Sequence, residues 1–374
     1  MAARSVRLSQ PGFDQGAPTK FRFVAAAALL AMALLLGAGA PRAQATPRPP
    51  ALRLTGAFPE GTAPGDATIV LRFSTGLAPI TARSEPRLSP AATGTWSQPN
   101  PTTLRFIPTG AYLPGTVVHI TVPKTLTAVD GSALRQADTA SFQVGSGSVV
   151  RLTQLLAELR YLPVHVVSAQ QPAPRDTPAQ LRAIFQPPAV KLALGAQWPT
   201  ELRALWSGDS ATVLRGAIMA FESQHGLAMD GVPSTALWQA LLTARARRQW
   251  NTGGYTYAVA SENSPETLTL YHNGHVVLST PANTGIPGQG TATGTFPVYE
   301  RLRSQTMQGT NPDGSHYADF VQFVAYFNGG DAVHYMPRAD YGSPQSLGCV
   351  ELPYSAAEQA WGYLTYGTLV TVLP

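Results

Sequence analysis

The sequence is poor in cysteine and in charged side chains. One of its 374 residues is a cysteine, Cys349, and 13% are charged. A single cysteine excludes an internal disulfide, and leaves either a reactive thiol or a small buried hydrophobe. The seven histidines show no H-x-H or H-x-x-x-D spacing, so the zinc site of a zinc carboxypeptidase is not indicated and no metal is expected.

The low charged fraction does not describe a disordered chain, because 44% of the residues are hydrophobic. With 34 Gly and 33 Pro, the composition is typical of an ordered protein that is rich in turns and strands. The length predicts two or three domains.

Basic residues and then an apolar run open the chain. Residues 4–22 include four Arg or Lys side chains, residues 23–40 are apolar, and Ala43-Gln-Ala45 follows them. This layout predicts that residues 1–45 are a signal peptide. The run is also close to the lower length limit of a membrane-spanning helix, so an uncleaved membrane anchor stays an alternative. In either case we expect the rest of the chain to be exported to the cell wall, the periplasm or the medium.

The net charge of +5 comes largely from this leader. Residues 1–45 hold five of the 26 basic and one of the 21 acidic residues, which leaves 21 basic against 20 acidic residues in the remainder. A nucleic-acid partner, which would require a basic surface, is therefore not indicated.

Residues 46–147 alternate apolar and polar side chains in short segments. The clearest are 68–73, 103–107, 117–122 and 140–144, separated by clusters of Pro, Gly, Asp and Ser. This spacing predicts a small β-sandwich. The segment resembles the bacterial immunoglobulin-like domains that precede cell-wall enzymes.

Residues 148–248 change to the helical period of 3.6 residues. The run Phe221-x-x-x-His225-Gly226-Leu227, followed by Asp230-Gly231 and Leu237-Trp238, resembles a three-helix peptidoglycan-binding domain. Gly226 is expected to end one helix, and Ser234 or Thr235 to cap the next. Residues 168–188 are expected to form a loop or insertion. Whether this domain binds glycan is not visible in the sequence.

Alternation returns in residues 253–374. Residues 255–259, 267–271 and 276–279 predict strands, with a tight hairpin at Asn273-Gly274. Ser355-x-x-Glu358 predicts a capping box that opens a helix, and residues 368–373 a final strand. The expected fold class is multidomain and mainly β, with one small helical domain and a C-terminal catalytic β-sandwich.

A histidine and the only cysteine lie near the end of the chain. His334 closes an expected strand, and a loop rich in Pro and Gly leads to Gly348-Cys349. Such a loop is long enough to fold back and bring the imidazole to the thiol. A thiol has a pKa of about 8.5 and becomes a strong nucleophile when an imidazole takes its proton. We therefore expect Cys349 to attack a carbonyl, and His334 to act as base. The amides of Gly348 and Cys349 are expected to stabilise the oxyanion, and Ser346 to orient the imidazole or the loop.

The same residues resemble the L,D-transpeptidase catalytic domain of the YkuD type. That family has a His at a strand end followed by G-x-P-x-S-x-G-C-[IV], which Gly342-Ser-Pro344-Gln-Ser346-Leu-Gly348-Cys349-Val350 matches at every fixed position. Thr284-Gly285 and residues 293–298 also resemble the family's paired strands.

The resemblance implies an enzyme of peptidoglycan biosynthesis that acts on cell-wall organisation and cell shape. The thiolate would attack the carbonyl of the third residue of a stem peptide, release D-Ala and form a thioester. An amine of a second stem would then attack the thioester and form a 3→3 cross-link. No cofactor is implied. The implied partners are peptidoglycan stem peptides and glycan, with carbapenems as inhibitors.

Three residues depart from the family pattern: Tyr335 after the base, Leu347 before Gly-Cys, and Glu351 where Arg or Asn is frequent. Glu351 would reverse the charge beside the site. We expect Tyr335, Glu351 and Tyr317 to contact the substrate. The alternative is a catalytically degenerate wall-binding protein, which Tyr335 and Glu351 support and which the intact His334 and Cys349 oppose.

Overall fold

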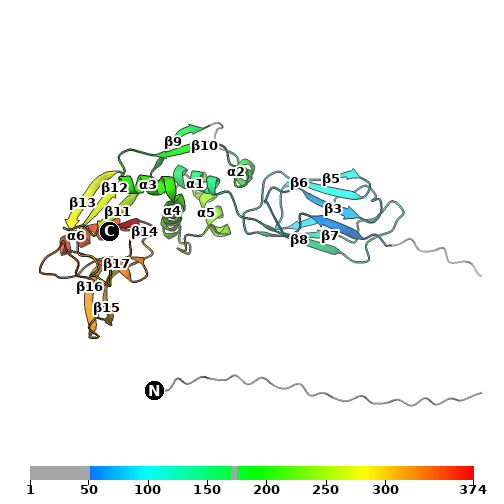
Figure 1. Cartoon of the computed structure of the whole chain (residues 1–374). Helices are drawn as coiled ribbons and strands as arrows, with labels where there is room; N and C mark the ends of the chain where they lie inside the picture. Colours follow the sequence, from blue (N-terminus) through cyan, green and yellow to red (C-terminus); the bar gives the residue numbers. More distant parts are fainter. Residues whose placement is uncertain (1–50, 170–174) are drawn as a thin grey trace, which may run out of the picture. The chain divides into compact units, whose positions relative to one another are not determined.

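The computed structural model describes residues 51–169 and 175–374 (Figure 1). The predicted signal peptide or anchor, residues 1–45, lies outside the described residues. Among the helices of the part described, none is long and apolar enough to cross a membrane.

Two four-stranded sheets occupy residues 54–144 and enclose one hydrophobic cluster. Alternation explains the arrangement, since Val118, Ile120 and Val122 of one strand are buried and the residues between them are exposed. The predicted strands are confirmed, whereas the immunoglobulin-like likeness stays a prediction. The strands are β1 (Leu54–Phe58), β3 (Ile69–Phe73), β6 (Thr103–Pro108) and β5 (Gly94–Asn100) in the first sheet, and β2 (Thr62–Ala63), β8 (Asp138–Val144), β7 (Val117–Val122) and β4 (Arg87–Ser89) in the second.

The region between residues 149 and 246 is helical, as expected, but it holds more than three helices. It contains α1 (Val149–Glu158), α2 (Thr177–Ala183), α3 (Thr200–Gly208), α4 (Ser210–His225) and α5 (Thr235–Ala246), with the strand pair β9 (Val164–Ala169) and β10 (Val190–Leu194). The prediction of a loop over 168–188 was wrong for α2. That helix forms because Asp176 accepts a hydrogen bond from the Ala179 amide, and Pro178 lies in its first turn.

The predicted helix ends in this region are confirmed. Gly226 follows α4 in the left-handed conformation, with φ 66° and ψ 31°. The Ser234 hydroxyl accepts a hydrogen bond from the Leu237 amide at 3.1 Å and so caps α5.

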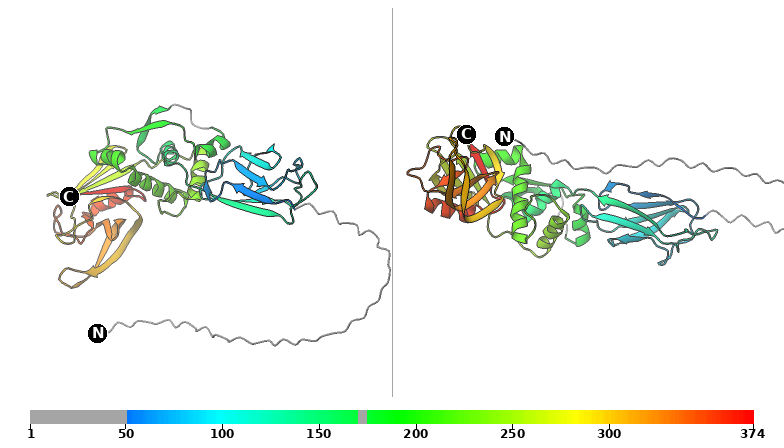
Figure 2. Two further views of the ribbon diagram at one scale, coloured as in Figure 1. Left: turned by 45° about the vertical axis from the view of Figure 1, so that its right-hand side comes forward. Right: turned by 90° about the horizontal axis from the view of Figure 1, so that it is seen from below.

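Two sheets and one helix make up the C-terminal domain, and they share a hydrophobic cluster. Figure 2 shows them from two further sides. The five-stranded sheet has the order β13 (His275–Pro281), β12 (Thr267–His272), β11 (Thr256–Ser261), β19 (Leu369–Leu373) and β14 (Gly294–Pro297), and the four-stranded sheet has the order β15 (Glu300–Thr310), β16 (His316–Asn328), β17 (Asp331–Tyr335) and β18 (Val350–Leu352).

The hairpin between β12 and β13 is confirmed, because Asn273 and Gly274 both have positive φ, 51° and 85°. The predicted capping box is wrong. Helix α6 (Tyr354–Tyr363) already includes Ser355, and its N-cap residue is Pro353, which offers no side-chain hydrogen bond.

Both faces of the five-stranded sheet contribute buried residues to a hydrophobic cluster. Ala258 and Ala260 of β11 are buried in the core of the C-terminal domain, whereas Tyr257, which alternates with them, belongs to the cluster of the helical region, together with Leu369 of β19. The helical region therefore packs against the sheet face that points away from the four-stranded sheet.

Candidate active site

Parallel pairing of β17 with β18 brings the predicted base and nucleophile together. Val333 lies opposite Val350 and His334 opposite Glu351. Cys349 directly precedes Val350, so it lies at the start of the strand that is adjacent to the strand of His334. The loop 336–349 makes the crossover between the two strands.

His334 is held in one tautomer by the backbone. Its side chain is buried, with 2% of the residue exposed, and Nδ1 lies 3.1 Å from the Tyr335 carbonyl oxygen. Because a carbonyl can only accept, Nδ1 carries the proton and Nε2 keeps its lone pair. Burial lowers the pKa of His334, opposed chiefly by the hydrogen bond to Tyr335. The imidazole is therefore neutral and can act as a base through Nε2.

The Cys349 thiol is half-buried and protonated. It donates a hydrogen bond to the Gly330 carbonyl at 3.7 Å. Burial is the main cause that raises the pKa of this thiol to about 12; the charges of Asp331 and Glu351 act in the same direction, and a backbone hydrogen bond from Ala332 opposes them. In the described contacts the thiol and the imidazole do not bond to each other. Both members of the pair are therefore neutral in this structure.

Ser346 and Gly348 shape the turn that presents the cysteine. The Ser346 hydroxyl donates to the Cys349 carbonyl at 2.6 Å and accepts from the Gly348 amide at 3.2 Å. Ser346 thus orients the loop, one of its two predicted roles. The Gly348 amide is already engaged, which argues against its predicted oxyanion role. Gly348 has φ 123°, a conformation that L side chains rarely adopt.

Glu351, for which a substrate contact was predicted, is engaged by a partner within the chain. Its side chain is buried and forms a two-point ion pair with Arg338, with Nε to Oε2 at 2.7 Å and Nη2 to Oε1 at 2.6 Å. Arg338 also donates to the Gln345 carbonyl at 3.1 Å. The expected charge reversal beside the site is therefore compensated within the chain, and the pair fastens the loop 336–349.

The two tyrosines predicted to contact substrate lie in different places. The Tyr335 ring packs edge-on against Tyr354, with centroids 5.1 Å apart. Tyr317 pairs with Gly309 in the β15–β16 hairpin, and its ring lies over that glycine. Strand β16 pairs with β17 only from Gln322 to Asn328. Tyr317 therefore lies on the part of the hairpin that extends past the strand of His334.

The segment Asn283-Thr284 forms hydrogen bonds with the loop 336–349 and with β18. Asn283 exchanges two backbone hydrogen bonds with Glu351, and its side-chain oxygen accepts from the Gly342 amide at 2.9 Å. The Thr284 carbonyl accepts from the amides of Gln345 and Ser346. Thr284-Gly285 was noted in the sequence only for its resemblance to the family pattern. In the structure Thr284 positions residues 346–349, which we call the nucleophile turn.

Sequence reasoning missed three groups at the site: the Tyr335 carbonyl, the Arg338 guanidinium and the Asp331 carboxylate. Asp331 begins β17, and its Oδ2 accepts from the Ala292 amide at 3.2 Å and from Asn328 Nδ2 at 3.3 Å. A polar residue at the start of the strand that carries the base was the only sequence signal for Asp331.

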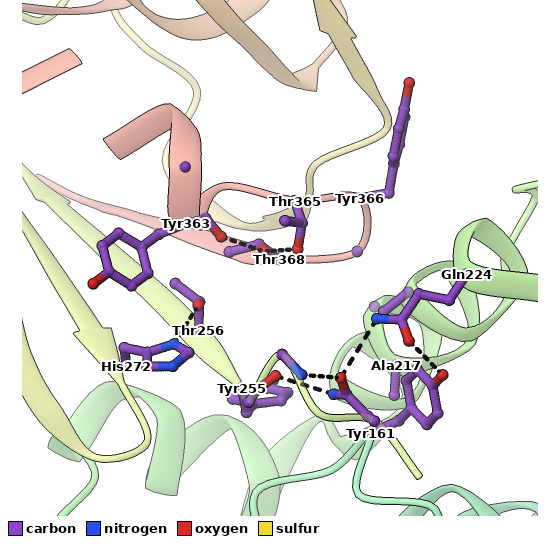
Figure 3. A pocket seen from close by; sticks show the side chains of 17 residues that line it. Tyr161, Ala217, Gln224, Tyr255, Thr256, His272, Tyr363, Thr365, Tyr366 and Thr368 are labelled. Atoms are coloured by element: carbon purple, nitrogen blue, oxygen red, sulfur yellow. Dashed lines mark hydrogen bonds between the residues drawn. The ribbon is translucent and has the colours of Figure 1, made fainter. Parts of the chain in front are cut away.

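A cavity of about 230 Å³ lies between the helical region and β11, and neither Cys349 nor His334 lines it (Figure 3). Its polar side chains bond to one another: the Tyr161 hydroxyl donates to Gln224 Oε1 at 2.6 Å, Gln224 Nε2 contacts Asn251 Oδ1 at 3.5 Å, and Asn251 donates to the Gly254 carbonyl at 3.0 Å. These bonds hold the segment 251–254, which leads into β11, against the helical region. Among the described residues no three His, Cys, Asp or Glu side chains are grouped as a metal site would require.

Comparison with protein-family models matches residues 256–372 to the YkuD L,D-transpeptidase catalytic domain. No curated protein matches the chain. Similar solved structures include an L,D-transpeptidase from Mycobacterium smegmatis, with 14% identity over 87% of this chain and all of that one and a TM-score of 0.30. Another is the catalytic domain of the E. faecium L,D-transpeptidase acylated by ertapenem, with 28% identity over 32% of this chain and 98% of that one and a TM-score of 0.29.

Proposed function

We propose that the YkuD L,D-transpeptidase catalytic domain formed by residues 256–372 makes this chain a cysteine-dependent acyltransferase that cross-links peptidoglycan stem peptides. The observation that carries the proposal is the β17–β18 pairing, which puts the only cysteine of the sequence, directly before β18, next to the strand of a backbone-oriented histidine. Acyl transfer by such a pair needs no cofactor.

In the first half-reaction, Cys349 Sγ attacks the carbonyl of the third residue of a donor stem. His334 Nε2 takes the thiol proton and then gives it to the departing amine of the terminal D-Ala, which leaves a thioester. The Cys349 amide is the donor that we assign to the oxyanion, since the Gly348 amide already bonds to Ser346.

The second half-reaction transfers the acyl group to an amine of a neighbouring stem. The amine attacks the thioester, the C–S bond breaks, and the proton lost by the nitrogen returns through His334 to the thiolate. The product is a 3→3 cross-link when the amine belongs to the third residue of the acceptor stem. This activity fits an exported protein, as the leader pattern of residues 1–45 predicts.

A catalytically degenerate wall-binding protein is the second candidate function. It is favoured by one observation, the raised pKa of the Cys349 thiol together with the absence of a described hydrogen bond to His334. Catalytic hydrogen bonds are often formed only when a substrate is bound, and the intact nucleophile turn therefore favours the enzyme.

Mass spectrometry of the intact protein with a carbapenem distinguishes the two functions. We expect one adduct per chain, on Cys349, and none in Cys349→Ala. The assay is then repeated with a tetrapeptide stem, for which the wild type should release D-Ala and form a cross-linked product. Wild-type protein that forms neither an adduct nor a product would establish the wall-binding alternative. Cys349→Ser, with its weaker nucleophile and similar shape, is the matched control for folding.

A further inference from the structure

Strand β16 contains one extra residue directly opposite His334. Gln322 of β16 pairs with Tyr335 of β17. The next pair joins Ala325 to Val333, after a shift in register. Four residues of β16 therefore span the same stretch as three residues of β17, and His334 is the central one of these three. This is the arrangement of a β-bulge, which bends its strand, increases the local twist and can re-aim a side chain.

The packing of β16 confirms the extra residue. Val321 and Val324 are three positions apart, yet both belong to the small hydrophobic cluster against which Cys349 packs. Phe323 belongs instead to the cluster that the two sheets and α6 share. In a regular strand, residues two positions apart lie on one face, so Val321 would share its face with Phe323. The bulge therefore changes which residues of β16 face the nucleophile.

Phe323 occupies the strained position of the bulge. Its φ is 59°, in the left-handed region that a bulky L residue rarely adopts. The ring is buried, with 3% of the residue exposed, and packs edge-on against Tyr354 with centroids 5.4 Å apart. It also lies 6.4 Å from the Trp361 ring, and the Arg303 guanidinium lies over it at 5.6 Å. A strained conformation persists only where its surroundings fix it, and these three side chains do so here.

The same ring is connected to the hydrogen bond that orients the imidazole. Tyr354, which contacts Phe323, also packs edge-on against Tyr335 with centroids 5.1 Å apart. Tyr335 supplies the carbonyl oxygen that lies 3.1 Å from His334 Nδ1. Its backbone also pairs with Gln322, the residue directly before Phe323. Phe323 is therefore connected to Tyr335 both through a ring contact and through the strand pairing.

We propose that Phe323 is a positioning residue for the base, which directs His334 by holding the bulge in β16. This inference rests on the proposed transpeptidase function. The bulge fixes the twist of β17 at His334, so Nδ1 meets the Tyr335 carbonyl and Nε2 keeps its lone pair for the thiol proton. When the Phe323 ring is removed, the left-handed backbone loses its anchor. We then expect β16 to relax, which changes the twist at His334 and weakens this hydrogen bond.

The experiment compares Phe323→Leu with Phe327→Leu in the full chain. Phe327 is the matched control, because it lies on the same strand, is also 3% exposed and belongs to the same cluster, but does not lie opposite His334. We expect both variants to lose a similar amount of stability. Stopped-flow fluorescence with a carbapenem should show acylation of Cys349 slowed about 10- to 100-fold in Phe323→Leu alone, because a small displacement of a catalytic group has an effect of this size.

NMR of protein labelled with ¹⁵N-histidine measures the state of the imidazole independently of catalysis. The His334 signals, identified by their loss in His334→Gln, should show the Nδ1-protonated form alone in the wild type and in Phe327→Leu. Phe323→Leu should show a mixture of the two neutral tautomers.

Tyr354 offers a second variant outside the core, since 47% of the residue is exposed. Tyr354→Leu should slow acylation in the same direction as Phe323→Leu, because the contact between Phe323 and Tyr335 is lost. Tyr354→Phe keeps the ring and should have the wild-type rate. If Phe323→Leu does not fold, the rates of these two variants decide the inference.

Two results would overturn the inference and leave the proposed function standing. One is a wild-type rate together with a single tautomer in Phe323→Leu. The other is equal slowing in Phe323→Leu and Phe327→Leu, which would mean that the two rings serve only the fold of the domain. If the wild type forms no adduct, the proposed function fails, and the spectra of the variants still decide whether Phe323 orients His334.

Discussion

The helical region and the catalytic domain both bury ionisable side chains, but they pair them differently. In the helical region Arg151 is fully buried, and its two terminal nitrogens bond to Gln154, Glu158 and Gln180 at 3.2, 3.2 and 2.8 Å. In the catalytic domain His334 bonds through one ring nitrogen and Asp331 through one carboxylate oxygen, and no described hydrogen bond uses the second atom of either.

The difference separates structural polar groups from reactive ones. A buried charge whose partners come from the chain stabilises that arrangement, and losing one partner is costly. A buried group can form hydrogen bonds through one atom and have no partner at another. Such a group is fixed in position while its second atom can still bind or react, as catalysis requires. Glu351 belongs to the structural kind although it lies two residues from the nucleophile.

The largest expected effect is on catalysis alone. His334→Gln should slow acylation of Cys349 by about 10²- to 10⁴-fold, because the general base is lost, while the unfolding midpoint changes little. Stopped-flow fluorescence with a carbapenem measures the rate. Retention of the rate would contradict the assignment of the base.

The pH profile of the wild type is the control for this variant. Burial lowers the pKa of His334 below its usual 6.5. The imidazole is the active neutral form above its pKa, so acylation should remain level as the pH falls through 6.5 and should decrease only at a lower pH. His334→Gln should remove this decrease.

The second largest expected effect is on the free energy of unfolding, with no change in catalysis. Arg151→Met should lower the free energy of unfolding by about 3 kcal/mol, because Gln154 and Glu158 lose a buried partner. Urea unfolding followed by circular dichroism measures it. Acylation of Cys349 in this variant should be unchanged under native conditions. If acylation fell together with stability, the distinction between a structural polar group in the helical region and reactive groups in the catalytic domain would be contradicted.

Local patterns predicted most of the fold. The strands of both sheet regions, the Asn273-Gly274 hairpin and the end of α4 at Gly226 depend on neighbours in sequence, and they were found. Two expectations failed. Asp176 caps the helix α2 within the expected loop 168–188, and α6 begins at Tyr354 after its N-cap Pro353, so that Ser355 already lies inside the helix.

The candidate site was predicted only where a motif specifies a side chain. His334 and Cys349 come from the motif, and the structure has His334 on β17 and Cys349 directly before the adjacent strand β18. The partner of Glu351 is Arg338, from a loop without periodicity, and the partner of His334 is a backbone carbonyl, which any residue provides. Such partners are fixed by how the loop 336–349 closes, and sequence spacing alone does not specify that closure.

The smallest expected effect tests whether Glu351 pairs with Arg338 or contacts the substrate. Glu351→Gln should lower the free energy of unfolding by about 2 kcal/mol, since Arg338 is left with a neutral partner in a largely buried place. Adding Arg338→Met should recover part of this loss, because the unpaired charge is then removed, and a double-mutant cycle in urea measures the coupling. If Glu351→Gln instead left stability unchanged and altered only the KM for the donor stem, Glu351 would contact the substrate as its sequence position suggested, and the distinction between paired and open buried charges would fail at the site itself.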